Sequence, residues 1–391
     1  MSIADWKGFG MGIEIFSTGT FVGRVWLSRV NGPALVAVRN GSLYDITSID
    51  APTMRDVLEM ESPADFVRAQ PGKLVGPLDQ FVIPTTSATS DAYLLAPIDL
   101  QAVKAAGVTF ARSMIERVIE ERAAGDQEYA EQVRERVTAI IGDSLRTLKA
   151  GSAEAAAVKA ALIEEGVWSQ YLEVGIGPDA EIFTKTQVMS SVGHNADVGL
   201  HPISKWNNPE PEIVLAVDSK GLIKGATLGN DVNLRDVEGR SALLLGKAKD
   251  NNASCSIGPF IRLFDETYCL DDVRNAEVSL RIEGVDGYVL EGRSSMSEIS
   301  RDPLDLVSQA IGRHHQYPDG LVLFMGTMFA PIEDRDVAGQ GFTHKIGDRV
   351  TISNDKLGTL RNRVQLSTNC PPWDFGVSQL MRNLASRKLL V

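Results

Sequence analysis

Two glutamates separated by one proline, Glu210-Pro-Glu212, open an apolar run in this chain, and Asp231 follows nineteen residues after Glu212. Alternate side chains of a β-strand share a face, so Glu210 and Glu212 point the same way, with roughly 7 Å between their Cα atoms. Their carboxylates repel unless a cation lies between them. A third carboxylate from a neighbouring segment would complete an all-oxygen site, which suits Mg²⁺, Mn²⁺ or Ca²⁺. Taken alone, such a pair is more often a solvent-exposed strand edge.

The residues around this pair predict strands joined by tight turns. Glu212–Val217 and Leu222–Thr227 flank the turn sequence Asp218-Ser-Lys-Gly221, which indicates a hairpin. The same reasoning predicts strands at Phe21–Leu27, Ala34–Val38, Val278–Ile282, Tyr288–Leu290, Leu321–Phe324 and Arg349–Ile352. Many short strands and few helices favour an α+β, mainly β fold with a mixed β-roll or β-sandwich core.

The helical part of the chain is confined to one segment. Between residues 110 and 166 the apolar residues recur at helical spacing, and Ser152 is expected to cap an alanine-rich helix. Residues 84–91 resemble a linker. We therefore expect a smaller N-terminal β-rich domain at 1–90 and a catalytic domain at 95–391, with the helical segment 110–166 as an insert.

The composition excludes several classes of protein. The 391 residues carry a formal net charge of −12, which argues against a nucleic-acid partner. The longest apolar stretch is too short to span a bilayer, so no membrane association is expected. Three widely spaced cysteines and an N-terminus without the pattern of a signal peptide indicate a cytoplasmic protein.

The motifs of the chain occur in an order that resembles the fumarylacetoacetate hydrolase superfamily over roughly residues 95 to 365. They are Gly107-Val-Thr-Phe110, Phe183-Thr-Lys185, Glu210-Pro-Glu212, Gly229-Asn-Asp231, Arg235-Asp236, Lys247-Ala-Lys-Asp250, Gly258-Pro259, Gly326-Thr327 and Gly347-Asp348. Each motif is weak by itself, and the ordered set is specific. Within the superfamily, three stretches are similar to the 2-keto-3-deoxy-pentonate dehydratases: Trp168-Ser-Gln-Tyr-Leu, Lys247–Cys255 and His314-His-Gln-Tyr-Pro.

The resemblance implies a metal site and a reaction class. It implies a β-roll with Mg²⁺ held by Glu210, Glu212 and Asp231, where the ion chelates the carboxylate and keto oxygens of a pyruvate-like substrate end. The C–C hydrolases of the superfamily carry a histidine where this chain has Ser113, whereas Glu116 keeps their acid. Because that histidine activates water, its replacement argues against hydrolysis and is compatible with a lyase.

The expected reaction is dehydration of a 2-keto-3-deoxy-pentonate, with 2-keto-3-deoxy-D-xylonate as the expected substrate, to 2-oxoglutarate semialdehyde in oxidative pentose (xylose) catabolism. The metal stabilises the enolate, and acid–base groups move the protons. Candidate acid–base residues are Glu116, Lys247 and Lys185. We expect Lys247 to take the C3 proton and Glu116 to help the hydroxyl leave; the reverse assignment stays open. Arg112, Ser113 and Thr327 are expected to bind the substrate.

Two other interpretations remain at this point. One is a C–C hydrolase or decarboxylase of the same superfamily acting on an acylpyruvate or another diketo acid. The other is a sugar-acid-binding protein or structural β-roll without catalysis, which the cost of three uncompensated carboxylates disfavours. The resemblance also implies a homodimer or homotetramer, and the sequence does not locate its interface.

Overall fold

The structure is a computed structural model of the 391-residue chain. It describes residues 18–82, 92–110, 114, 148–164, 166, 168–329, 333–336 and 341–390. The predicted linker at 84–91 and residues 111–113 and 115–147 of the predicted helical segment lie outside the described residues.

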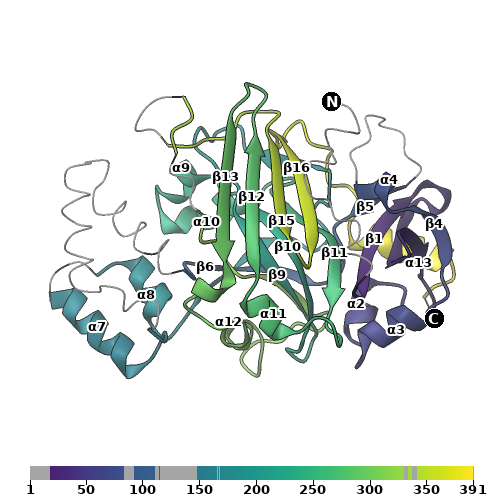
Figure 1. Ribbon diagram of the computed structural model, residues 1–391, viewed down its shortest axis with the longest axis horizontal. Helices are drawn as coiled ribbons and strands as arrows, with labels where there is room; N and C mark the ends of the chain where they lie inside the picture. The colour runs from purple at the N-terminus through teal and green to yellow at the C-terminus, as the bar shows by residue number, and fades with distance from the viewer. Residues whose placement is uncertain are drawn as a thin grey trace.

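Most of the described strands belong to one large sheet and one small sheet (Figure 1). The 11-stranded sheet has the order β4-β3-β2-β1-β11-β10-β9-β14-β6-β7, and β5 pairs with β1. Its strands are β1 (Phe21–Leu27), β2 (Gly32–Arg39), β3 (Ser42–Asp45), β4 (Lys73–Pro77), β5 (Ala92–Leu95), β6 (Ala102–Gly107), β7 (Glu181–Thr186), β9 (Pro211–Val217), β10 (Ile223–Asp231), β11 (Cys255–Leu263) and β14 (Leu321–Phe324).

The smaller sheet has five strands in the order β13-β12-β15-β16-β8. They are β8 (Asp197–Leu200), β12 (Glu277–Glu283), β13 (Val289–Ser295), β15 (Arg349–Asn354) and β16 (Gly358–Leu366). The mainly β architecture and all the strands predicted from sequence are confirmed, including the two hairpins β9–β10 and β12–β13.

Strand β9 is buried on both faces, which explains its uninterrupted apolar run. Ile213 and Leu215 pack in a core shared with the small sheet, which lies in front of β9 and β10 in Figure 1. Val214 and Ala216 face the opposite core, which includes side chains of helices α2 (Met54–Leu58) and α3 (Pro63–Ala69). The two cores hold β9 from both sides and fix which residues each face presents.

The N-terminal strands continue the large sheet, because β1 pairs antiparallel with β11 through Phe21 and Arg262. They also enclose an apolar cluster of their own, which contains Phe21, Val36 and Phe260. The expectation that residues 1–90 form a separate domain stays a prediction.

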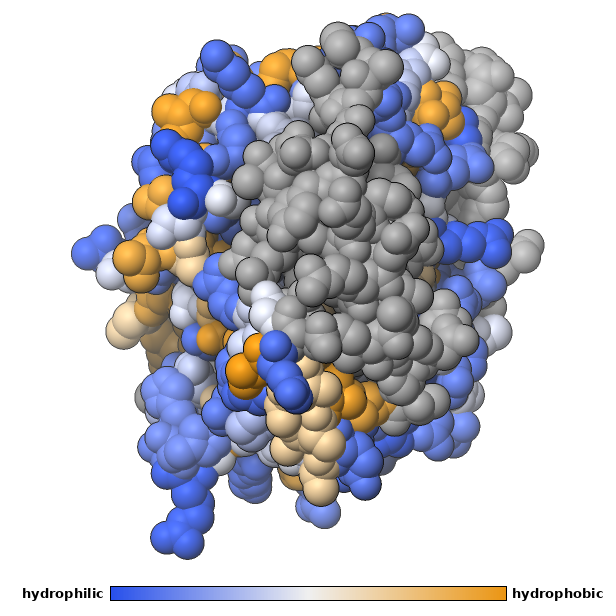
Figure 2. All heavy atoms as spheres, turned by 90° about the vertical axis from the view of Figure 1, so that its left-hand side faces the viewer, coloured by the Kyte–Doolittle hydropathy of each residue, from blue (hydrophilic) through white to orange (hydrophobic). Residues whose placement is uncertain are grey.

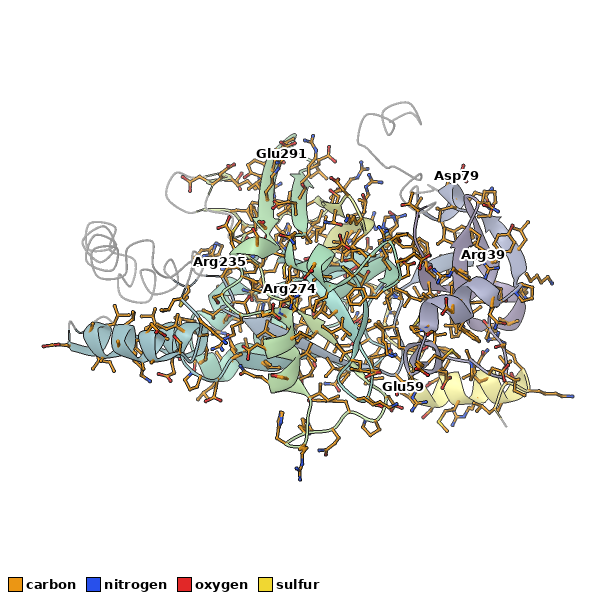
Figure 3. The ribbon with its side chains drawn as sticks, turned by 60° about the horizontal axis from the view of Figure 1, so that its bottom comes forward. Arg39, Glu59, Asp79, Arg235, Arg274 and Glu291 are labelled. Atoms are coloured by element: carbon orange, nitrogen blue, oxygen red, sulfur yellow. The ribbon has the colours of Figure 1, made fainter. Side chains whose placement is uncertain are left out.

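Hydrogen bonds within the turn, and others to a residue far away in the sequence, fix the turn of the β9–β10 hairpin. The Asp218 carboxylate accepts the backbone N–H groups of Lys220 and Leu222, and Gly221 adopts φ +82°. Ser219 donates its N–H and hydroxyl to the two carboxylate oxygens of Glu59 at 2.6 and 2.7 Å. Glu59, which follows helix α2, is labelled in Figure 3. The hairpin is therefore attached to the end of helix α2.

The remaining helices lie at the periphery of the two sheets (Figure 1). The predicted alanine-rich helix is α7, and the Ser152 hydroxyl accepts the N–H of Ala155 at its start. The helices are α4 (Asp79–Val82), α7 (Ala153–Glu164), α8 (Gln170–Ile176), α9 (Arg235–Glu238), α10 (Leu245–Lys249), α11 (Leu270–Arg274), α12 (Pro303–Ala310), α13 (Val377–Ser386) and the 3₁₀ turns η2 (Ser28–Val30), η4 (Ala242–Leu244) and η5 (Met296–Glu298).

No helix among the described residues has the length and apolar character that crossing a bilayer requires. On the face shown in Figure 2, the described side chains are mostly hydrophilic, with small separate groups of hydrophobic ones.

His194 joins helix α4 to the small sheet. Its Nε2 lies 2.9 Å from the carbonyl oxygen of Val82, and its Nδ1 accepts the N–H of Arg361 on β16. Burial lowers the pKa of His194 to about 4, against an ordinary value of 6.5. The neutral imidazole therefore contributes stability that is fully present above about pH 6.5 and is lost as the pH falls from there towards about 4.

We expect this loss to reach about 3 kcal/mol of unfolding free energy. His194→Gln keeps a donor for Val82 but removes the titration. Denaturant unfolding at about pH 7 and about pH 4.5 should show a loss about 2–3 kcal/mol smaller in this variant than in the wild type. The exposed His315, changed to Gln, is the matched control. Equal acid sensitivity of wild type and His194→Gln would contradict the prediction.

Candidate metal centre

Three buried carboxylates converge where strands β9 and β10 meet. Glu210 directly precedes β9, Glu212 lies within it, and Asp231 ends β10. The Asp231 N–H donates to the Glu210 carbonyl at 3.0 Å, which places these two residues side by side across the strand pair. One oxygen from each of the three carboxylates lies within 4.8 Å of the others. The convergence expected from the sequence is thus confirmed.

Gly229 allows this close arrangement. It lies opposite Glu212 in the β9–β10 register. A Cβ atom at this position would lie 2.3 Å from the ring of Phe324 and 2.5 Å from a methyl of Val214. Any larger residue would push β9 and β14 away from β10, and so displace Glu212 from Asp231.

The electrostatics of the cluster show that it is short of positive charge. Burial raises the pKa of Glu212 well above its ordinary value, and the carboxylates of Asp231 and Glu210 raise it further. Burial also raises the pKa of Glu210, although the ammonium of Lys249 opposes that rise. A divalent cation would stabilise the ionised form of all three groups.

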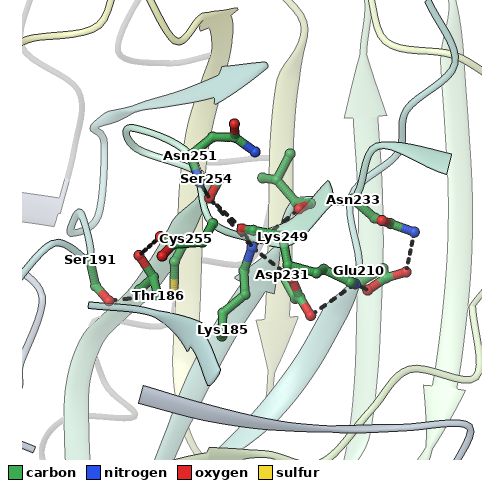
Figure 4. Close-up of polar contacts among 12 residues, drawn as sticks. Lys185, Thr186, Ser191, Glu210, Asp231, Asn233, Lys249, Asn251, Ser254 and Cys255 are labelled. Atoms are coloured by element: carbon green, nitrogen blue, oxygen red, sulfur yellow. Dashed lines mark hydrogen bonds and ion pairs between the residues drawn. The ribbon is translucent and has the colours of Figure 1, made fainter. Parts of the chain in front are cut away.

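Two buried lysines approach the carboxylates (Figure 4). Lys249 Nζ donates to Glu210 Oε2 and to Asp231 Oδ2, the latter at 3.1 Å. Lys185 Nζ lies 2.9 Å from Asp231 Oδ1 and also donates to the carbonyl oxygens of Lys249 and Val232. Lys185 was among the residues predicted from sequence, whereas Lys249 was not.

Lys247, a predicted acid–base residue, lies outside the carboxylate cluster. Its side chain is exposed, and Lys249 on the same helix α10 is the lysine that enters the cluster. Residues two positions apart on an α-helix point about 200° apart, so only one of these two lysines can face inward. The sequence showed two lysines there, and the packing of α10 decides between them.

Thr327 is half-buried and directly follows a residue that contacts the cluster, and its predicted role in substrate binding stays a prediction. The N–H of the preceding Gly326 donates to Glu212 Oε2 at 2.6 Å, and the Thr327 hydroxyl accepts the N–H of Phe329. Arg112, Ser113 and Glu116 lie outside the described residues, and their roles stay predictions.

Asn233 is a site residue that the sequence analysis missed. Its Nδ2 donates to Glu210 Oε1 at 3.1 Å and to Glu238 Oε2 at 2.6 Å, so it orients the first carboxylate. It follows Asp231 by two residues, and alternation in an extended segment would have placed both side chains on one face. The sequence could not indicate the contact between Gly326 and Glu212, because Gly326 makes it with its backbone N–H.

The residues present fit a hard divalent cation. They offer three carboxylates with oxygen ligands, buried and fixed by neighbouring donors, and three ligands from the protein leave coordination positions for water or substrate oxygens. Sulfur and imidazole ligands do not take part in this cluster, whose members are Glu210, Glu212 and Asp231.

Comparison with known proteins identifies the region that carries this site. Residues 177–365 match the family model described as fumarylacetoacetate (FAA) hydrolase C-terminal. A probable 2-keto-3-deoxyxylonate dehydratase of Haloferax volcanii is 27% identical over 330 residues, which cover 84% of this chain and 94% of the relative. A 2-dehydro-3-deoxy-D-arabinonate dehydratase of Saccharolobus solfataricus is 31% identical over 180 residues, or 46% and 57% of the two chains.

A solved structure shares the fold. A 2-keto-3-deoxy-D-arabinonate dehydratase complexed with magnesium and 2,5-dioxopentanoate superposes with a TM-score of 0.59 at 20% identity, covering 88% of this chain and 99% of that one. Residues 177–365 of this chain, which contain all three carboxylates, are therefore similar to the C-terminal domain of the fumarylacetoacetate hydrolase family.

Proposed function

We propose that this chain is a divalent-metal-dependent dehydratase that converts a 2-keto-3-deoxy-pentonate to 2-oxoglutarate semialdehyde in pentose catabolism. The observation that carries the proposal is the buried cluster of Glu210, Glu212 and Asp231, whose oxygens converge within 4.8 Å. Further support comes from the two sequence relatives, both of which are named as dehydratases of such sugar acids.

Within the D series, the substrates named for these two relatives are one compound. D-Xylonate and D-arabinonate differ only at carbons 2 and 3, and both differences vanish when carbon 2 becomes a ketone and carbon 3 a methylene. The 2-keto-3-deoxy derivatives of the two acids are therefore identical. The configuration at carbon 4 is the one stereochemical choice that remains, and the D form in the name of the Saccharolobus relative supports the D form for this chain.

Mg²⁺ is the metal we propose, because the similar solved structure is described as complexed with magnesium and 2,5-dioxopentanoate. The latter compound is 2-oxoglutarate semialdehyde under another name. When bound, the ion would be held by Glu210, Glu212 and Asp231, and would polarise the 2-keto group so that the C3 protons become more acidic.

The residues of the chain would then move protons. A base removes a proton from C3, and the C4 hydroxyl leaves as water after it gains a proton. A proton passes from C5 to C3, and the resulting enol becomes the aldehyde by protonation at C4. Burial alone would lower the pKa of Lys249, but Asp231 and Glu210 outweigh burial and hold it above its ordinary value. As long as no ion occupies the carboxylates, Lys249 is therefore held in its cationic form.

Of the predicted acid–base residues, Glu116 then becomes our proposed base at C3, because Lys247 is exposed. This is the reverse of the first assignment, in which Lys247 takes the C3 proton. Thr327 would position the substrate next to the carboxylates, since Gly326 beside it contacts Glu212. The expected homodimer or homotetramer stays a prediction.

A substrate panel tests the reaction. We expect D-2-keto-3-deoxy-pentonate to be converted to the semialdehyde with a kcat/KM at least about 10³-fold higher than that for acylpyruvates, because the site must recognise the hydroxyl groups at C4 and C5. Coupled oxidation of the semialdehyde measures the product. Release of pyruvate from an acylpyruvate at the higher rate would instead support the hydrolase.

Removal of one carboxylate tests the metal centre. Glu212→Gln should weaken Mg²⁺ binding, measured by titration calorimetry, at least about 100-fold, because it removes one of three charged ligands. Glu291→Gln is the control, since Glu291 is exposed on β13 of the small sheet (Figure 3). Unchanged affinity of Glu212→Gln would show that the ion binds elsewhere.

Variants of Lys247 and Lys185 test whether Lys247 acts as the base at C3. Lys247→Ala should keep kcat/KM within about twofold of wild type, as is usual for an exposed side chain. Lys185→Met should lower it by at least about 100-fold, because it leaves Asp231 with one ammonium partner fewer in a buried cluster. Deuterium exchange at C3 is followed separately from semialdehyde formation. Equal slowing of exchange in both variants would return Lys247 to the mechanism.

A further inference from the structure

The ammonium of Lys249 lies among the oxygens that a divalent ion would bind. It donates to Glu210 Oε2 and to Asp231 Oδ2, each of which belongs to one of the three converging carboxylates. The other oxygens of these two groups face Asn233 and Lys185. An ion that binds Glu210 and Asp231 therefore meets a positive charge already seated on both.

Lys185 and Lys249 are held in different ways. Lys185 Nζ donates to the carbonyl oxygens of Lys249 and Val232, besides its ion pair with Asp231, so backbone acceptors fix it in place. The backbone of Lys249 is also fixed, because its carbonyl accepts Lys185 Nζ and the Ser254 hydroxyl. Its Nζ, in contrast, contacts two carboxylates, at the end of a stem with four rotatable bonds.

An aromatic ring already lies near this ammonium. The ring centroid of Phe183 is 5.7 Å from Lys249 Nζ, within the range in which an aromatic face attracts a cation. The side chain could therefore leave the carboxylates without losing all favourable contacts, and without any movement of α10.

We propose that Lys249 is a built-in counter-cation that competes with the divalent ion for Glu210 and Asp231. In protein without the ion, its ammonium holds the carboxylates together against their mutual repulsion. When the ion binds, the ammonium gives up these oxygens and turns towards Phe183, because two cations on the same carboxylates repel each other. Lys249 thereby weakens metal binding and stabilises the metal-free fold.

Titration calorimetry with Mg²⁺ alone, after removal of bound metal by a chelator, tests this proposal, which rests on the metal site of the proposed function. Lys249→Met should bind Mg²⁺ at least about tenfold more tightly than wild type, because it removes the competing charge. Lys249→Arg, which keeps the charge, should stay within about threefold. Lys247→Met is the matched control on the same helix and should not change the affinity.

Thermal unfolding gives an independent readout. Lys249→Met should melt at a lower temperature than wild type in chelator, and Mg²⁺ should restore its melting temperature. Affinity of Lys249→Met equal to or weaker than wild type would overturn the proposal. So would tightening of Lys249→Arg as large as that of Lys249→Met, since the effect would then come from packing.

If Lys249→Met does not fold, the proposal can be tested on the wild-type protein by magnetic resonance. The ammonium resonance of Lys249, assigned with Lys249→Arg, should shift during a Mg²⁺ titration more than that of Lys185. Mg²⁺ binding with an unchanged Lys249 signal would overturn the competition and leave the metal site intact. No Mg²⁺ binding at all would reject both the metal site and the competition.

Discussion

Repulsion among three buried carboxylates is the interaction on which the rest of the site depends. Glu210, Glu212 and Asp231 place oxygens within 4.8 Å of one another where little solvent reaches them. The surrounding groups all donate hydrogen bonds to, or form ion pairs with, these negative carboxylates. They are two ammonium groups, the Asn233 amide and the Gly326 N–H. Even so, burial and neighbouring carboxylates keep the pKa of Glu212 well above its ordinary value. The cluster is built to receive a further cation, and a hard divalent ion suits its oxygen donors.

The sheet provides the precision that such a cluster needs. Because side chains alternate along a strand, a slip of one residue between β9 and β10 would send the carboxylates to the opposite face. Apolar side chains of β9 fill cores on both sides of the sheet, and the tie between Ser219 and Glu59 fixes the turn of the hairpin. The register is thus set by the core and the turn, and it brings Asp231 beside Glu210.

Much of this arrangement could be predicted from sequence. The strands around Glu212 and Asp231, the turn at Asp218–Gly221 and the convergence of the three carboxylates follow from local patterns, and the structure confirms them. Lys249 could not be chosen over Lys247, because both lie on one short helix and only its packing shows which faces inward. The pairing of β1 with β11 was likewise invisible, since it joins residues more than two hundred positions apart. Local periodicity predicts elements; the contacts between distant elements decide the site.

The central claim is that these three carboxylates bind a divalent ion. Crystals grown with Mn²⁺, which replaces Mg²⁺ and scatters anomalously, test it most directly. The account predicts an anomalous difference peak within about 2.5 Å of one oxygen each of Glu210, Glu212 and Asp231. A peak at other residues with none at this cluster, under conditions in which the protein retains activity, would contradict it.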